Sequence, residues 1–106
     1  MDRKTFAAQS EQALADLERR LADLEDEALE PDLAGDVLSL EFSDGTTFVI
    51  NAHSAARQIW MAAGTEAWHF DFDPDRNAWV AHKNGDELYD TVRRVVSDKL
   101  GRPIDL

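Results

Sequence analysis

Apolar residues recur at three- and four-residue steps near the start of the chain, which is the spacing of one face of an α-helix. The residues concerned are Phe6, Ala13, Leu14, Leu17, Leu21, Leu24 and Ala28. They predict an amphipathic helix over about residues 5–27, closed by Pro31 and Gly35. A second stripe with the same spacing predicts a helix over about residues 86–100.

Between these helices, apolar and polar residues alternate, which is the period of a half-buried strand. The alternation predicts short strands over residues 37–42, 47–51, 58–63, 67–72 and 78–82. The Asp44-Gly45 pair is typical of a tight hairpin turn. Short connections favour an antiparallel meander with one face covered by helices. The expected fold is therefore α+β: a two-layer sandwich, with N- and C-terminal helices packed on one face of an antiparallel sheet of about five to six strands.

Alternation also separates the two faces of the segment QIWMA, residues 58–62. Ile59 and Met61 go with the apolar face, which leaves Trp60 on the face that no helix covers. Exposed tryptophan is enriched at binding hot spots, so Trp60 is a candidate anchor for a protein partner. Asn51 and Gln58 are expected on the same face. The alternative is a tryptophan that lies flat across neighbouring strands.

Length and composition limit the class of protein. A chain of 106 residues, 43% hydrophobic and 31% charged, predicts a single globular domain over residues 1–106. The absence of cysteine excludes disulfides and thiolate metal sites. No apolar run suggests a signal peptide or a membrane span, so we expect a cytoplasmic protein.

The negative charge is unevenly distributed along the chain. The net charge is −11, and residues 1–44 hold thirteen of the 22 acids but only four of the eleven bases. Seven carboxylates fall within residues 21–36 without any Lys or Arg. Such a field repels nucleic acid and anionic membranes and attracts cations or basic protein surfaces. We therefore expect neither nucleic-acid nor membrane binding.

The carboxylates of the first helix divide into two sets on a helical wheel. Glu11, Glu18 and Glu25 form a seam beside the leucine stripe. The other set is expected on the solvated far side, near Arg19; it consists of Asp16, Asp23 and Asp26. A solvated helix face is the simplest interpretation of such charges.

Two observations favour a binding role for these acids. The run continues beyond the helix through Glu30, Asp32 and Asp36, and acids near a helix C-terminus oppose the helix dipole. Exposed carboxylates suit hard cations such as Fe²⁺, Fe³⁺, Mn²⁺, Ca²⁺ or Mg²⁺. Without a buried cage, binding should be weak, reversible and not very selective.

No motif indicates an enzyme. His53, His69 and His82 lack the spacing of a metal triad, and surface imidazoles are the expected interpretation. The chain has no phosphate-binding loop and no recognisable nucleophile motif. Oxidation of iron would need paired carboxylates holding two ions close together, and exposed ligands give little control over that geometry.

Several segments together resemble the frataxin family in its bacterial CyaY form. They are the acidic first helix, the DGT hairpin, VIN, QIWMA, WHFDF and NGDELYD leading into the last helix. The similarity spans about residues 5–100, is densest over residues 35–70, and is most specific from Asn51 to Trp60. The fold that it implies agrees with the one predicted from periodicity.

The resemblance implies an iron donor or regulator in iron–sulfur cluster assembly that contacts cysteine desulfurase and the scaffold protein. It places Glu18, Asp23 and the acids from Glu25 to Asp32 in the family's acidic ridge. With Asp36, the candidate metal ligands are eight residues, here named the acidic ridge: Glu18, Asp23, Glu25, Asp26, Glu27, Glu30, Asp32 and Asp36. The resemblance places Asn51, Gln58 and Trp60 in the partner patch.

The sequence departs from the family pattern at four positions. Arg19 and Ala22 stand where bacterial members often have acids, and His53 and Ala55 replace a usual Gln and Pro. The alternative function is an acidic adaptor that binds the desulfurase–scaffold complex, with incidental metal binding. We expect a monomer, with oligomerisation on iron loading as a further alternative.

Overall fold

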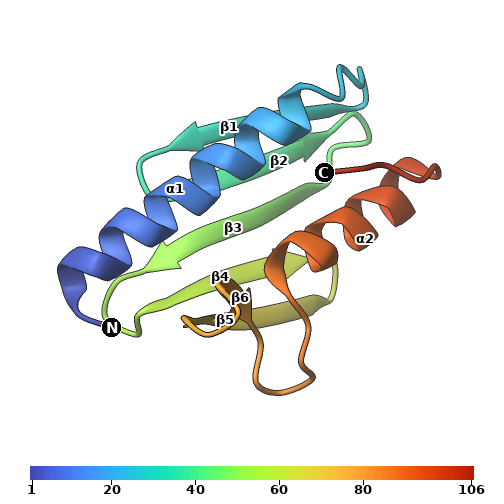
Figure 1. The fold of residues 1–106 in the computed structure, drawn as a ribbon. Helices are drawn as coiled ribbons and strands as arrows, with labels where there is room; N and C mark the ends of the chain where they lie inside the picture. Colours follow the sequence, from blue (N-terminus) through green and yellow to red (C-terminus); the bar gives the residue numbers. More distant parts are fainter.

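The computed structural model describes residues 1–106, and its six strands form one antiparallel sheet in the order β1 to β6. The strands are β1 (Leu29–Ala34), β2 (Val37–Phe42), β3 (Thr47–His53), β4 (Gln58–Ala63), β5 (Glu66–Asp73) and β6 (Ala78–Val80). Helices α1 (Arg3–Ala22) and α2 (Leu88–Leu100) both lie on the same face of this sheet (Figure 1). The predicted two-layer α+β sandwich is confirmed. Neither helix has the length and apolar character needed to cross a membrane.

Helix α1 begins where a side chain satisfies its first free N–H groups. Asp2 is the N-cap, and its carboxylate accepts a hydrogen bond from the Thr5 N–H at 2.7 Å. The predicted apolar stripe is buried against the sheet, with Leu14, Leu17 and Leu21 at most 1% exposed. This face orients the helix, so that Glu11 is exposed whereas Asp16 and Glu18 are partly buried.

The end of α1 differs from the prediction. The helix ends at Ala22 rather than near residue 27, and Glu25 has the left-handed φ of 50°. Arg19 and Arg20 occupy the last turn, where cations complement the helix dipole, and the acids that follow would oppose it. Leu24 nevertheless packs against the core from the turn, so the helical spacing of apolar residues continues beyond the helix itself.

Strand β1 was not predicted from the sequence. Its residues 30–32 are Glu, Pro and Asp, which are all depleted in strands. The strand lies at the sheet edge, where charges and proline are tolerated, and it pairs only with β2. Its inward Leu29 is 7% exposed, so burial of apolar side chains outweighs poor local propensity.

The inner sheet face forms the core, as the alternation predicted. Leu38, Leu40, Ile50, Ile59 and Phe70 are each at most 1% exposed. The residues between them form rows across the uncovered outer face. One row runs through directly paired positions on four strands: Val37, Asn51, Trp60 and His69.

The residues after α2 pack back onto the molecule. Ile104 is 5% exposed, and its N–H donates to Ser97 Oγ at 3.1 Å. Arg102 binds Asp26 in the α1–β1 turn, so the residues after α2 join this helix to that turn. This contact was not predicted.

Candidate functional site

The acidic ridge lies along one edge of the molecule. Glu18 is on α1, Asp23 to Glu27 follow in the α1–β1 turn, Glu30 and Asp32 are on β1, and Asp36 is in the next turn. Six ridge carboxylates are exposed and make no hydrogen bond or ion pair within the protein: Asp23, Glu25, Glu27, Glu30, Asp32 and Asp36. These six retain their full capacity to bind a cation or a basic group.

The other two ridge residues have structural partners. Glu18 Oε2 accepts the Leu33 N–H at 3.2 Å and thereby joins α1 to β1. Asp26 accepts the Ala28 N–H at 2.9 Å and two bonds from the Arg102 guanidinium, at 3.0 and 2.7 Å. The Ala28 N–H and then Arg102 lower the pKa of the Asp26 carboxyl below its ordinary value. The expectation that Asp26 is simply solvated is therefore wrong.

Pairing between β1 and β2 adds a carboxylate that the sequence interpretation omitted. Glu41 lies directly opposite Glu30, and both are exposed on the outer face. Side chains at such positions have Cβ atoms about 4.5–5.5 Å apart, so the two like charges repel. The alternation of VLSLEF already places Glu41 outward. Its pairing with Glu30 could not be predicted, because β1 itself was not predicted.

The ridge is an open array of ligands. No group of three or more His, Asp or Glu side chains is arranged closely enough to hold a metal ion. Glu30 and Glu41 lie opposite each other on two hydrogen-bonded strands and so have a fixed backbone separation. Chemically, this edge offers hard oxygen ligands to a cation that keeps much of its own water.

Trp60 lies on the outer sheet face, between inward Ile59 and Met61, as alternation predicted. It is partly buried, because the rings of His53 and His69 stack on it with centroid distances of 3.9 and 4.4 Å. Its indole N–H donates to Gln58 Oε1 at 2.8 Å. Asn51 lies directly opposite on β3. The structure thus brings all three predicted partner-binding residues together.

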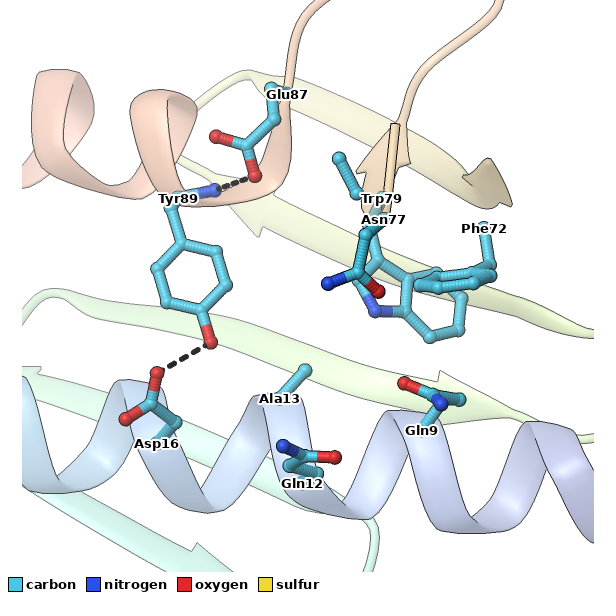
Figure 2. A pocket seen from close by; sticks show the side chains of 10 residues that line it. Gln9, Gln12, Ala13, Asp16, Phe72, Asn77, Trp79, Glu87 and Tyr89 are labelled. Atoms are coloured by element: carbon cyan, nitrogen blue, oxygen red, sulfur yellow. Dashed lines mark hydrogen bonds between the residues drawn. The ribbon is translucent and has the colours of Figure 1, made fainter. Parts of the chain in front are cut away.

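Asp16 is the clearest correction to the predicted acidic faces. It was expected on the solvated side of α1, but Figure 2 shows it in contact with Tyr89 of α2, where both side chains line a cavity of about 360 Å³. The Tyr89 hydroxyl donates to Asp16 Oδ2 at 2.8 Å, and Arg19 and Arg20 also bind this carboxylate. Burial opposes ionisation of Asp16, but the bonds from Tyr89, Arg20 and Arg19 prevail and lower its pKa.

The pKa of Tyr89 is shifted in the opposite direction. Burial, followed by the adjacent Asp16 carboxylate, raises the pKa of the Tyr89 phenol well above its ordinary value of 10.0. The phenol therefore acts as a hydrogen-bond donor that holds the two helices together. Asp16 has a structural role and lies outside the acidic ridge.

A two-layer α+β sandwich with unpaired carboxylates along one edge and an aromatic group on its free sheet face is the architecture of a small acidic α+β domain. Residues 1–102 match the family model of the frataxin-like domain. The chain belongs to the frataxin-like family.

Two bacterial relatives cover nearly the whole chain. One from Thioalkalivibrio sulfidiphilus is 39% identical over 96% of each chain, and one from Bordetella avium is 34% identical over 98% of this chain and 96% of its own. Both are named iron-sulfur cluster assembly protein CyaY. These similarities confirm the resemblance that the sequence segments indicated.

Solved structures agree with the fold. Frataxin from Psychromonas ingrahamii superposes with a TM-score of 0.89 over 99% of this chain and 97% of its own, at 22% identity. Trimeric frataxin from Saccharomyces cerevisiae, complexed with ferrous iron, has a TM-score of 0.76 and 25% identity, covering 89% and 87% of the two chains. The first shows the fold alone.

Proposed function

We propose that this protein binds iron reversibly along its acidic ridge and takes part in iron–sulfur cluster assembly as an iron donor or regulator. The observation that carries the proposal is the set of six exposed ridge carboxylates without protein partners, one of which, Glu30, lies opposite a further exposed carboxylate, Glu41. The names of its relatives, and the yeast frataxin complexed with ferrous iron, support it.

Iron in this proposal is cargo. Carboxylates are hard oxygen ligands, and a bound cation would relieve the repulsion between them. Because the ligands are exposed and spread along a turn and an edge strand, the affinity is low and the ion exchanges readily. Other divalent cations compete for the same carboxylates. The protein needs no catalytic activity for this role.

The proposed partners are cysteine desulfurase and the scaffold protein. The ridge supplies negative charge for a basic surface, and Trp60 with Asn51 supplies a contact on the sheet face. In the alternative function, an adaptor uses these two surfaces for docking alone, and the metal is incidental. The Glu30–Glu41 repulsion favours the metal-binding role, since a cation relieves it locally.

A pair of matched variants tests the ridge. Glu30→Gln with Asp32→Asn removes two ridge charges, whereas Glu66→Gln with Asp75→Asn removes two exposed, unpaired charges elsewhere. We expect the ridge variant to bind ferrous iron at least about tenfold more weakly in calorimetric titration, because ligand charge count sets such affinities. The control should bind like the wild type. Equal losses of iron affinity in both variants would mean that iron binding depends on net charge and not on the ridge.

A desulfurase assay separates the two functions. If iron binding matters, added ferrous iron changes the effect of the wild type on desulfurase activity, and the ridge variant loses this response. If the protein is an adaptor, its effect is the same with and without iron. In that case the ridge variant would only bind the complex more weakly and with a smaller dependence on salt.

A further inference from the structure

Three aromatic rings form a continuous stack on the outer sheet face. The interplanar angle is 14° between His53 and Trp60 and 15° between Trp60 and His69. Trp60 pairs directly with His69 on β5, while His53 lies two residues beyond Asn51 on β3. We name these three residues the aromatic stack. Both faces of the indole are covered by imidazoles, one from each neighbouring strand.

A chain of hydrogen bonds fixes the rotation of the indole within the plane of its ring. The Trp60 N–H donates to Gln58 Oε1 at 2.8 Å, and Gln58 Nε2 donates to Asp71 Oδ1 and Oδ2 at 3.2 and 3.3 Å. Both ends of the Gln58 amide are therefore engaged within the protein. Gln58 orients the tryptophan and has little capacity left for a partner.

These contacts decide which part of Trp60 a partner can reach. Its two faces and its N–H are occupied, which leaves the carbon edge of the ring for a partner. Trp60 also lines a hollow of about 160 Å³, whose other lining side chains are mainly apolar, among them Val49, Ala62 and Ala67. An aliphatic side chain suits such a lining, because it loses water without leaving a polar group unpaired.

We propose that His53 and His69 are positioning residues that fix Trp60 edge-on, and that a protein partner inserts an aliphatic side chain beside that edge. A side chain already held in its bound orientation loses less entropy on binding, which strengthens association without a new contact. Two imidazoles suit this task because each gives a flat face to the indole and keeps its polar edge for other partners. His53 Nδ1 accepts the Ala56 N–H at 3.2 Å, which holds that ring in place, and His69 is exposed. The partner half of the proposal rests on the proposed function; the positioning half does not.

The positioning half is tested on the free protein. In wild type, the Trp60 indole N–H resonance, assigned with Trp60→Phe, should carry the ring-current shift of two stacked neighbours. We expect His53→Ala and His69→Ala each to move it toward the position of an unstacked indole, and His53→Phe and His69→Phe to retain the shift. Thr47→Ala, an exposed substitution on β3, is the control. Alanine variants with an unchanged Trp60 resonance would overturn the positioning role.

The partner half is tested by titration against the desulfurase–scaffold complex. We expect the two alanine variants to weaken binding about three- to tenfold, the phenylalanine variants to restore it, and Ala62→Leu to weaken it by filling the hollow. If Trp60→Ala weakens binding but the alanine variants and Ala62→Leu do not, edge-on docking is wrong. If Trp60→Ala itself binds normally, the partner patch of the proposed function fails, whereas the resonance shifts still decide the positioning role.

Discussion

The Asp16 carboxylate has a different role in the structure from the one that its position in the sequence predicts. It is one of three acids on α1, yet it accepts a hydrogen bond from the hydroxyl of a residue 73 positions away along the chain. Removing that hydroxyl with Tyr89→Phe should lower the free energy of unfolding by about 1 kcal/mol, since Asp16 keeps its two arginine partners. Urea melts measure this change. A loss near zero would mean that water replaces the bond at no cost.

The same pair predicts a pH dependence. Tyr89 is the only tyrosine, so ultraviolet absorbance follows its ionisation alone. Its raised pKa stabilises the fold below the ordinary value of 10.0, and this contribution is lost as the pH rises through the folded value. We expect Asp16→Asn to lower the Tyr89 pKa, and Glu66→Gln to leave it unchanged. If Asp16→Asn also leaves it unchanged, burial alone accounts for the raised pKa.

At the scale of elements, the α1–β1 turn contains acids with opposite roles. Glu25 and Glu27 are exposed and unpaired, whereas Asp26 binds the Ala28 N–H and Arg102. Glu25→Gln with Glu27→Gln should raise the melting temperature by relieving repulsion. Asp26→Asn should lower it, because the turn loses its charged acceptor. Calorimetric scans distinguish the two, and shifts of the same sign in both variants would contradict this division of the ridge.

The last residues of the chain act on the whole molecule, since they connect α2 to the α1–β1 turn. Ile104→Ala should lower the free energy of unfolding by roughly 2–3 kcal/mol, the low end for truncating a buried isoleucine. Leu106→Ala is the control, because Leu106 is only partly buried and should cost less. Urea melts of the two variants give the comparison. Equal and small losses would show that this segment adds little to the core.

Net charge is the second property of the whole molecule that can be tested. With −11 overall and most of it in residues 1–44, added salt should stabilise the folded state by screening repulsion. About 1 kcal/mol corresponds to about 4–8 °C in melting temperature for a small domain. We expect a rise of a few degrees between low and moderate ionic strength, and a smaller rise for Glu30→Gln with Asp32→Asn. A fall on adding salt would mean that attractive ion pairs dominate.

Local pattern was enough to predict both helices, five of the six strands and the face on which Trp60 lies. Each depends on periodicity that neighbouring residues express themselves: Leu14, Leu17 and Leu21 repeat at helical spacing, and Ile59 and Met61 flank Trp60 by alternation. The acidic character of the region from residue 21 to 36 is likewise visible in composition alone. These features need no knowledge of distant contacts.

The tertiary structure decided what each of these residues touches. Strand β1 exists because pairing with β2 buries Leu29, against the propensity of Glu30 and Pro31. Asp26 differs from its exposed neighbours because it binds a residue 76 positions away. Trp60 is stacked between imidazoles from two other strands. Such contacts depend on the packing of segments far apart in the chain, and periodicity carries no information about them. The sequence by itself determined the layers and the charge, whereas only the folded structure decided which carboxylates are free.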